Sequence, residues 1–377
     1  MELKEYRFDE VTINFDKKRV PLSGAQREKR QGNFRYYGAQ GVIDHIDDFI
    51  FDGTYLLIAE DGENLKSKKQ NIAQVVEGQF WVNNHAHIVQ GNELCNTRYL
   101  CYLLNSMDLS GYVTGSAQPK LSQANLNAVT LFLPSITVQE RIVECLYLFD
   151  KKIAVNQKIN DNLYEMVNAY YTSLFRENDC EMTTVGNYAE RIYSGGTPMT
   201  SNAAYWNGTF GWFSSGETRN RFVISTEKTI TQAGIDNSST KLATKYDIVM
   251  ASAGQGFTRG QTSMLLIDTY VNQSVIVIKS ERNILPYLFW NLANRYDELR
   301  AISDSSSIRG SLTTKMIAAF EIPLANEQSL QAFADFAWSV IPQIENNLLE
   351  NERLTALRDS LLPKLMSGEI DVSDIQL

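Results

Sequence analysis

The segment at 153–163 reads IAVNQKINDNL, and a matching segment, IENNLLENERL, follows at 344–354. Both place Ile, Asn, Asn and Leu at their first, fourth, eighth and eleventh positions. This alternation of three- and four-residue steps is typical of the seam of a coiled coil. The sequence therefore predicts two long helices that carry equivalent seams.

The predicted seam extends well beyond these two segments. In the first helix its rows are Ile142, Phe149, Asn156, Leu163 and Tyr170, and Leu146, Ile153, Asn160, Val167 and Leu174. In the second helix they are Phe333, Val340, Asn347, Leu354 and Leu361, and Ala337, Ile344, Asn351, Arg358 and Leu365. The alternative interpretation is a pair of amphipathic helices that lie on a globular core.

The asparagines lie at the middle of each seam and predict how the helices pair. Asn156 and Asn160 flank the midpoint of the first, and Asn347 and Asn351 flank that of the second. Because a buried amide is costly without a polar partner, antiparallel pairing in this register satisfies all four together. Two residues disagree with an unbroken seam. Pro342 should kink or start the second helix, and Arg358 replaces an apolar residue.

The duplication reaches beyond the helices. Tyr99-Leu100 recurs as Tyr287-Leu288, and Val82-Asn83 recurs as Val271-Asn272. Leu133-Pro134 matches Ile322-Pro323, and Ile58-Ala59 matches Met250-Ala251. The offset between the two members is nearly the same in every match, as it is between the two seams. An ordered series with a nearly constant offset indicates two copies of one unit, and hence a pseudo-twofold protein.

Each copy combines a mixed α/β domain with one long helix, which gives an α+β fold. Strands are expected at 54–59 and 275–278, and helices at 97–106 and 286–293. We place the domains at 1–134 and 179–325 and the helical regions at 135–178 and 326–377, with the helices as an antiparallel coiled coil that separates the domains. The offset from Tyr36-Tyr37 to Trp212-Phe213 is shorter than the others, so the second copy carries extra residues between 216 and 246.

The composition limits which class of protein this chain can belong to. The 377 residues are 44% apolar and 11% aromatic, which predicts folded domains. The net charge is −9, but the stretches 135–182 and 330–377 carry −8 of it, so the α/β domains are near neutral and compatible with DNA binding. No apolar run reaches membrane length, and the charged segment at 1–5 lacks the apolar stretch of a signal peptide, so we expect neither a membrane span nor a secretory signal. The cysteines, Cys95, Cys101, Cys145 and Cys180, form no C-x-x-C pair, so we expect reduced thiols in a cytoplasmic protein.

The sequence contains no recognisable enzymatic motif. Gly254-x-Gly256 is followed by Arg259 where a dinucleotide fingerprint needs glycine, and no Gly-Lys pair exists for a P-loop. The Asn-Pro-Pro-Tyr/Phe motif of adenine methyltransferases is also missing. His85 and His87 alternate on a probable strand, so their side chains should point the same way. Since no cluster of further ligands accompanies them, we expect no bound metal and no catalytic residue.

Five stretches together resemble the specificity (S) subunits of type I restriction–modification enzymes, over essentially the whole chain. The segment 357–370, LRDSLLPKLMSGEI, is similar to that family's terminal segment. The segment 115–121, GSAQPKL, resembles the end of its first recognition domain. SGGTP at 194–198, with YWNG at 205–208, resembles the opening of a recognition domain, and YYGAQG at 36–41 and VNNHAH at 82–87 resemble another subtype.

The resemblance implies a DNA-binding, non-catalytic subunit. Each of two target-recognition domains would read one half of a bipartite, asymmetric double-stranded DNA site. The helices would set the spacing of the halves and dock two modification (methyltransferase) subunits. The chain itself would hold no cofactor. S-adenosylmethionine, ATP and Mg²⁺ would be bound by the modification subunits and by the restriction and translocase subunits of the assembly.

We expect DNA contacts from loop residues, with phosphates bound by Lys and Arg and base edges read by polar side chains. Candidates in the first domain are Arg27, Lys29, Arg30, Arg35, Tyr37, Gln40, His85, Gln118 and Lys120. Candidates in the second are Thr197, Tyr205, Ser214, Ser215, Gln255, Arg259, Arg309 and Lys315. The plainer interpretations are solvated surface charges, core packing for Tyr36, Trp206 and Trp212, and a simple turn at 195–198.

Two other functions stay open at this point. One is a self-sufficient methyltransferase, against which the missing motifs speak. The other is a scaffold that no longer reads DNA, against which the two complete domains speak. The sequence gives neither the half-site sequences nor the length of the spacer between them.

Overall fold

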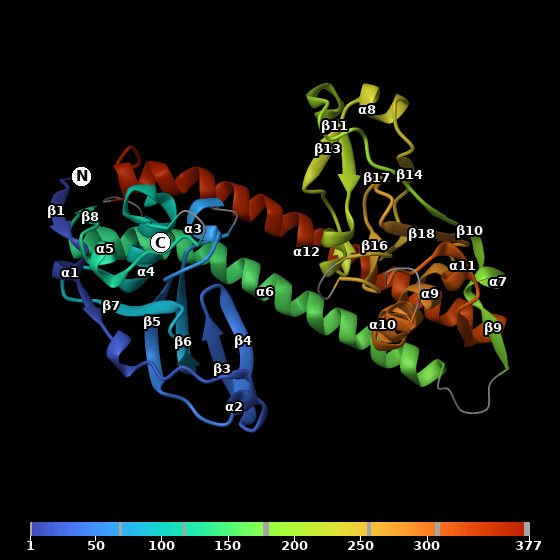
Figure 1. Ribbon diagram of the computed structural model, residues 1–377, viewed down its shortest axis with the longest axis horizontal. Helices are drawn as coiled ribbons and strands as arrows, with labels where there is room; N and C mark the ends of the chain where they lie inside the picture. The colour runs from blue at the N-terminus through green and yellow to red at the C-terminus, as the bar shows by residue number, and fades with distance from the viewer. Residues whose placement is uncertain are drawn as a thin grey trace. The chain divides into compact units, whose positions relative to one another are not determined.

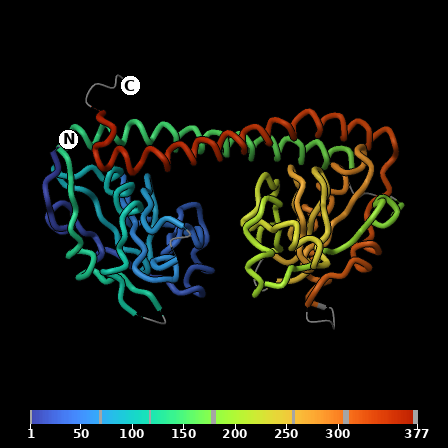
Figure 2. The backbone as a smooth tube through the Cα atoms, turned by 90° about the horizontal axis from the view of Figure 1, so that it is seen from above, coloured from blue at the N-terminus to red at the C-terminus, as the bar shows by residue number. Residues whose placement is uncertain are grey.

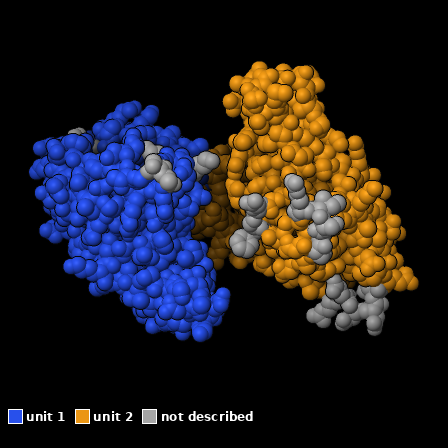
Figure 3. All heavy atoms as spheres, viewed as in Figure 1, with its two compact units in different colours: residues 1–152, 354–377 blue, residues 153–353 orange. Residues whose placement is uncertain are grey.

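The computed structural model describes residues 2–67, 70–115, 118–175, 181–254, 258–305 and 310–372. The chain divides into two compact units (Figure 3): unit 1 holds residues 1–152 and 354–377, and unit 2 holds residues 153–353. Two long helices, α6 (Ile136–Leu174) and α12 (Glu327–Ser367), each contribute to both units. Each unit therefore combines one α/β region with part of both helices.

The α/β region of unit 1 is built on a sheet in which the described strands follow the order β2-β7-β5-β6-β3-β4 (Figure 1). Neighbouring strands are antiparallel, except that β3 and β6 are parallel. These strands are β2 (Thr12–Asn14), β3 (Gln31–Gly38), β4 (Gly41–Ile46), β5 (Phe51–Ala59), β6 (Ala73–Val82) and β7 (Ala86–Gly91), beside the separate pair β1 (Lys4–Arg7) and β8 (Thr130–Leu133). The helices are α1 (Phe8–Val11), α2 (Gly24–Glu28), α3 (Asn64–Ser67), α4 (Thr97–Ser106) and α5 (Gln123–Asn127), with 3₁₀ turns η1 (Asp16–Lys18) and η2 (Ser110–Tyr112).

The α/β region of unit 2 divides its described strands among three sheets, ordered β10-β18-β15-β16-β12, β13-β11-β17-β14 and β19-β9. The strands are β9 (Met182–Thr184), β10 (Ala189–Ser194), β11 (Trp206–Phe213), β12 (Phe222–Val223), β13 (Lys228–Ile230), β14 (Lys241–Ala243), β15 (Ile248–Ala251), β16 (Thr262–Leu265), β17 (Thr269–Val271), β18 (Val275–Ser280) and β19 (Glu321–Pro323). The helices are α7 (Val185–Tyr188), α8 (Gln232–Asp236), α9 (Leu285–Asn294), α10 (Tyr296–Ser305) and α11 (Thr314–Ala318), with η3 (Ala203–Tyr205) and η4 (Ser215–Arg219).

The secondary structure expected from the sequence is confirmed. The expected strands lie within β5 and β18, and the expected helices coincide with α4 and α9. Helix α4 begins where the Asn96 side chain accepts hydrogen bonds from the backbone N–H groups of Arg98 and Tyr99, as an N-cap does. Helix α9 has Pro286 in its first turn, where proline removes no helical hydrogen bond.

The internal duplication is confirmed by backbone hydrogen bonds that recur at the same offset. The N–H of Leu121 donates to Glu60 O over 2.8 Å in unit 1, and that of Leu312 donates to Ser252 O over 2.8 Å in unit 2. The parallel strand pairs are also equivalent, since Tyr37 pairs with Val82 and Phe213 pairs with Val271. The two units are therefore copies of one fold.

The predicted extra residues of the second copy form structure of their own. In unit 1, β4 is the one strand between the equivalent strands β3 and β5. In unit 2, the described residues between β11 and β15 hold η4, β12, β13, α8 and β14. The two copies therefore differ in the elements between these equivalent strands, while the arrangement of the equivalent strands is shared.

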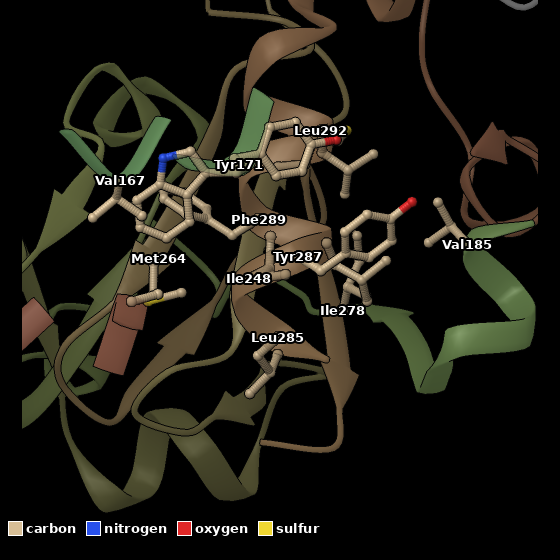
Figure 4. Close-up of a cluster of buried hydrophobic side chains, with 14 of the residues drawn as sticks. Val167, Tyr171, Val185, Ile248, Met264, Ile278, Leu285, Tyr287, Phe289 and Leu292 are labelled. Atoms are coloured by element: carbon tan, nitrogen blue, oxygen red, sulfur yellow. The ribbon is translucent and has the colours of Figure 1, made fainter. Parts of the chain in front are cut away.

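The core of unit 2 joins its α/β region to the long helices (Figure 4). Helix α9 is buried along most of its length, and its Tyr287 and Phe289 pack among Ile248, Met264 and Ile278. Val167 and Tyr171 of α6 belong to the same cluster. In unit 1, Ile142 and Leu146 of α6 and Leu365 of α12 join the core in the same way. The alternative interpretation, helices packed on a globular core, thus holds for the parts of the helices near each α/β region.

In each unit, α6 and α12 lie side by side in opposite directions (Figures 1 and 2). In unit 2, Asn156 Nδ2 donates to Asn351 Oδ1 over 2.9 Å and to Glu350 Oε2 over 2.7 Å. Asn347 Nδ2 donates to Asn160 Oδ1 over 2.7 Å. Residue numbers rise on α6 as they fall on α12, so the predicted antiparallel pairing is confirmed. The four asparagines meet as two pairs, which we call the asparagine layer.

The structure accommodates Pro342 and Arg358, the two residues that interrupt the predicted seam, in different ways. Helix α12 neither begins nor ends at Pro342, so the expectation of a helix start there was wrong. Arg358 pairs with Asp150 of α6, with Nη1 and Oδ1 2.6 Å apart, and Asp150 also accepts a hydrogen bond from the Tyr102 hydroxyl of α4. Arg358 therefore replaces an apolar contact by an ionic one that includes the α/β region of unit 1. None of the described helices has the length and apolar character to cross a membrane.

We expect the asparagine layer to show strong coupling in a double-mutant cycle. Asn351→Leu removes one of the two acceptors of the buried Asn156 amide and leaves only Glu350, so the free energy of unfolding should fall by about 1–3 kcal/mol. Asn156→Leu with Asn351→Leu restores an apolar pair and should cost at least about 1 kcal/mol less than the sum of the single changes. Denaturant unfolding measures both effects.

Asn346→Leu is the matched control, since Asn346 is exposed on α12 and makes no contact in the layer. It should change the free energy of unfolding by at most about 0.5 kcal/mol. Simple additivity of the two layer substitutions would contradict the role of the pair.

Candidate nucleic-acid interface

Three loops of unit 1 meet at one end of its sheet, and we call residues 60–63, 83–85 and 118–121 the first loop cluster. Glu60 N–H donates to His85 O over 2.9 Å, and Gly62 N–H donates to Pro119 O over 3.1 Å. The side chain of Gln40, from the turn between β3 and β4, lies beside Gly62, since a Cβ built there would be 3.7 Å from Gln40 Nε2. The cluster thus brings together four candidates, all exposed: Gln40, His85, Gln118 and Lys120.

The first loop cluster contains basic side chains, but each of them faces a carboxylate. His85 Nδ1 lies 2.7 Å from Asp61 Oδ2, and Lys120 Nζ lies 3.3 Å from Glu60 Oε1. Burial works to raise the pKa of Glu60, but the hydrogen bond from Arg19 and the nearby His87 and Lys120 outweigh it and hold that pKa below its ordinary value. The cluster therefore presents paired charges and amide groups, which suit base edges better than phosphates.

A buried ionic network lies beneath this cluster. His87 is 1% exposed, with Nδ1 2.6 Å from Asp16 Oδ2 and Nε2 2.8 Å from the carbonyl oxygen of Leu121. Asp16 also accepts from the N–H of Ile88 over 2.8 Å and lies 3.3 Å from Arg19. Burial works to raise the pKa of Asp16, but these hydrogen bonds and charges keep that pKa below its usual value.

His85 and His87 do not share a face, contrary to the expectation from their spacing. Strand β7 begins at Ala86, so His85 lies in the preceding turn, where strand alternation does not apply. Its side chain is half exposed, whereas that of His87 is buried. In the described part of the chain, no group of three or more His, Cys, Asp or Glu side chains is arranged to hold a metal ion.

Arg27, Lys29 and Arg30 lie toward the opposite end of β3 from Gln40. The guanidinium of Arg27 lies over the ring of Tyr36 and pairs with Asp44, with Nε and Oδ2 2.8 Å apart. That of Arg30 lies over Trp81 and pairs with Asp47 at 2.8 Å. Lys29 is exposed. These residues form a basic edge whose arginines are held in place by aromatic rings and carboxylates.

Two further residues of β3 were proposed to contact DNA. Arg35 is exposed, and its Nη2 donates to the carbonyl oxygen of Glu77 over 2.6 Å. Tyr37 is 4% exposed and packs edge-on against Phe80, so it is a core residue in this structure. Tyr36, for which core packing was the plainer interpretation, is fully buried.

Unit 2 has an equivalent second loop cluster, formed by residues 195–199, 252–254, 272–274 and 310–312. Ser252 N–H donates to Ser274 O over 2.8 Å, and Gly195 N–H donates to Asn272 O over 3.2 Å. The hydroxyl of Thr197 is hydrogen-bonded to Gln273. Of the candidates in unit 2, Thr197 thus lies in the cluster, while Gln255 and Arg309 lie outside the described residues.

The Gly195-Gly196-Thr197-Pro198 segment is held on a pair of tryptophans. The indole N–H of Trp212 donates to Gly196 O over 3.3 Å, and that of Trp206 donates to Met199 O over 3.2 Å. A Cβ at Gly195 would lie 1.9 Å from the carbonyl oxygen of Val271. Only glycine therefore allows this close approach of two backbones. The segment is a fixed loop with Thr197 and Met199 at its outer end.

The other candidates of unit 2 are more constrained than the sequence indicates. Arg259 donates from Nη1 to Gly310 O over 2.5 Å and pairs with Asp304, and its side chain is only 12% exposed. The Ser214 hydroxyl bonds to Glu217 Oε1 over 3.0 Å and caps η4, which begins at Ser215. Tyr205 is half-buried in η3, and Lys315 is exposed on α11.

A protein-family model described as the type I restriction modification DNA specificity domain matches the chain twice, over residues 2–165 and 179–352. The chain belongs to this family. It is 35% identical over 138 residues to a putative type I restriction enzyme specificity subunit of Haemophilus influenzae, which covers 37% of this chain and 35% of that relative. It is 26% identical over 253 residues to the EcoR124I/EcoR124II specificity subunit of Escherichia coli, and this match covers 63% of this chain and 61% of that relative. The matches thus span about a third and about three-fifths of these relatives.

A solved structure shows the same fold over nearly the whole chain. The type I restriction-modification S subunit from M. genitalium matches with a TM-score of 0.59, covering 97% of this chain and 96% of that one, at 14% sequence identity. At this identity the likeness concerns the fold alone. Two specificity domains, each with its own loop cluster, are therefore present in one chain.

The second specificity domain contains two groups of cations over aromatic rings that the sequence did not indicate. Arg191 and Lys241 lie over the ring of Tyr193, with cation-to-centroid distances of 4.8 and 5.7 Å. Lys228 lies 5.8 Å over Trp206, next to Phe210, which is 37% exposed. Arg191 and Tyr193 alternate on one strand, so their shared face was visible in the sequence, whereas the contacts across strands were not.

We expect Arg259 to stabilise unit 2 and Lys315 to contribute little. Arg259→Gln removes the ion pair with Asp304, which keeps only its longer contact with Arg300, and one of the two hydrogen bonds that Gly310 O accepts, so the free energy of unfolding should fall by about 1–3 kcal/mol. Lys315→Gln removes an equal charge from an exposed helix and should change it by less than about 0.5 kcal/mol. Chemical unfolding of both variants tests this, and equal stabilities would leave Arg259 as an ordinary surface cation.

Proposed function

We propose that this chain is the DNA-reading subunit of a type I restriction–modification complex, and that each specificity domain reads one half of a split, asymmetric target. The observation that carries this is the same loop frame occurring twice with different side chains. The first loop cluster presents Gln40, His85 and Gln118, and the second presents Thr197 and Gln273. Different polar groups on equivalent frames suit two different half-sites.

The long helices would set the distance between the half-sites. Helix α6 has 39 residues. A helix of this size is roughly 58 Å long. Major-groove faces on one side of B-DNA repeat about every 34–36 Å, so this length corresponds to between about one and two turns of DNA. In this proposal the asparagine layer fixes the helix register, and with it the spacer length of the target.

Helix α6 also offers a surface for the modification subunits. In unit 2, Val155, Ile159 and Met166 are 46%, 38% and 45% exposed. Their spacing of four and seven positions places them on one helical face. Such an exposed apolar row is typical of a helix that docks onto another protein. We propose that it is covered by a helical partner, one of two modification subunits, through which the restriction and translocase subunits join.

In this proposal the chain has no catalytic role of its own. The enzymatic motifs missing from its sequence would belong to the partners, which would bind S-adenosylmethionine, ATP and Mg²⁺. Binding of S-adenosylmethionine to the isolated chain, measured by calorimetry, would favour a methyltransferase instead.

Selection from random-sequence duplex DNA tests the proposed function. The chain assembled with its modification subunit should enrich a two-part motif with a fixed spacer. Gln118→Ala, in the first loop cluster, should relax the sequence of one half, and Thr197→Val, in the second, should relax the other half. Each should cost about 1–3 kcal/mol of discrimination at the affected base pair.

The outcomes of this selection are distinct. No enrichment even with the modification subunit would mean a scaffold that does not read DNA. Loss of both halves from a single substitution would contradict independent reading by the two domains. Lys4→Gln is the control, since Lys4 is exposed on β1, belongs to neither loop cluster and is not a candidate DNA contact.

We expect Ile159→Glu to weaken binding of the modification subunit by about 10- to 100-fold, because a carboxylate then occupies an apolar contact. Gln157→Glu adds the same charge to an exposed position of α6 on a different face and should have little effect. Titration by calorimetry or sedimentation measures both affinities. Equal affinities for the two variants would place the docking surface elsewhere.

A further inference from the structure

We propose that His87 is a positioning residue that, when doubly protonated, holds the 118–121 loop of the first loop cluster in place. Reading by unit 1 then depends on pH, whereas reading by unit 2 does not. The part of this inference that concerns DNA rests on the proposed function, and the part that concerns the loop stands on the contacts of His87.

The contacts of His87 require a proton on each ring nitrogen. Nε2 faces the carbonyl oxygen of Leu121, which can only accept a hydrogen bond. Nδ1 faces the Oδ2 atom of Asp16. The other carboxylate oxygen of Asp16 accepts a hydrogen bond from the N–H of Ile88, and the carboxylate lies 3.3 Å from Arg19. Asp16 is therefore ionised and has no proton to give. Both hydrogen bonds then originate from the ring, and His87 is an imidazolium.

The charges around the ring agree with this assignment. From η1, Asp16 contacts Nδ1 directly, and from the segment after β5, Glu60 lies 3.9 Å away. Arg19 lies 3.0 Å from Glu60, and Lys120 reaches the same carboxylate from the 118–121 loop. Lys120 is half exposed, so the buried set consists of two carboxylates, Arg19 and His87. Loss of the ring proton would leave an uncompensated negative charge in that buried set.

The network ties the 118–121 loop to the sheet. His87 lies on β7 opposite Ile58 of β5, and its hydrogen bond to Leu121 O is a side-chain anchor for the loop. Leu121 N–H donates to Glu60 O, so the same residue is held from both sides. When the ring loses a proton, either Asp16 or Leu121 loses its donor. The anchored residues adjoin Gln118 and Lys120, whose positions would then be less well defined.

The second copy of the fold provides an internal comparison. Ile276 of β18 lies opposite Met250 of β15, as His87 lies opposite Ile58. Ile276 is fully buried and carries no titratable group. The loop frame of unit 2, where Leu312 N–H donates to Ser252 O, is therefore held without an imidazolium.

Hydrogen exchange of the full chain tests the anchor without DNA. The amides of the 118–121 loop should lose about tenfold of their protection as the pH rises from about 6 to about 9, after correction for intrinsic exchange. The stabilisation is present when the ring is protonated and is lost as the pH rises, so the sign is opposite to that of a carboxylate. The amides of 310–314 in unit 2 should not change.

His87→Gln should remove this pH dependence and leave the loop weakly protected throughout. His45→Gln is the matched control, because His45 is exposed on β4 and belongs to neither loop cluster, and it should behave as the unchanged chain. A pH dependence that survives in His87→Gln, or protection that is flat with pH in the unchanged chain, would overturn the proposal.

A direct titration keeps the test valid if His87→Gln does not fold. The chain contains three histidines, so ¹³C labelling of histidine gives three ring signals, which His45→Gln and His85→Gln assign. The His87 signal should have the chemical shift of an imidazolium at about pH 7. A neutral ring at that pH would overturn the proposal.

DNA binding then separates the two proposals. At high pH, the assembled complex should discriminate about tenfold less against base changes in the half-site that unit 1 reads. Its discrimination against base changes in the other half-site should stay the same. Equal loss at both half-sites would contradict the role of His87. No sequence preference at any pH would contradict the proposed function, but would leave the exchange and titration results to decide the anchor.

Discussion

The antiparallel pairing of α6 with α12 through the asparagine layer is the constraint on which the rest of the structure depends. The partners are Asn156 with Asn351 and Asn160 with Asn347. A slip by one heptad would move α12 by about 10 Å along α6 and would place at least one amide of α6 against a Leu, Ile or Val side chain of α12. Because both units contain parts of both helices, such a slip would break the packing of each. The layer thus selects one register at some cost in stability.

Both α/β regions join the helices through apolar cores, and each region also makes further contacts of its own with them. In unit 1 the contact is ionic, because the Tyr102 hydroxyl and Arg358 both bind Asp150. Burial, reinforced by the Asp150 carboxylate, raises the pKa of Tyr102 well above its ordinary value, so its hydroxyl remains a donor. The sequence did not predict the ion pair of Arg358 with Asp150, because Arg358 only interrupted the apolar seam.

In unit 2 the further contacts between the α/β region and the helices include aromatic rings. The guanidinium of Arg282 lies over the rings of both Tyr246 and Trp338, and Lys245 pairs with Glu345 at 2.6 Å. Tyr246 has a positive φ, a conformation that is costly for a residue with a large side chain and persists only where its surroundings hold it. It directly precedes Asp247 and β15, and β15 leads into Ser252 of the second loop cluster. The extra residues of the second copy therefore help to hold the α/β region of unit 2 against the helices.

The sequence predicted those features that depend on local periodicity or on repetition. The 3–4 spacing around Asn156 and Asn347 predicted the helices and their direction, and the constant offset predicted two copies of one fold. Features that depend on contacts between distant residues were not predictable in this way. Nothing near Arg27 or Arg259 in the sequence indicates that Asp44 and Asp304 pair with them, and the burial of Tyr37 follows from packing against Phe80. The same limit applies to His87, whose partners come from residues 71 and 34 positions away.

The pairing of most basic candidates with carboxylates bears on how the chain would bind DNA. Arg27, Arg30 and Lys120 each face an acid, so a phosphate must displace or share that partner, and the electrostatic gain is smaller than for free cations. The network of rings and carboxylates instead fixes the direction of each guanidinium before DNA arrives. Such an arrangement favours discrimination among sequences over affinity for any DNA. In the proposed complex, the bulk of the non-specific attraction would then come from the modification subunits, since the two helical stretches of this chain carry most of its net negative charge.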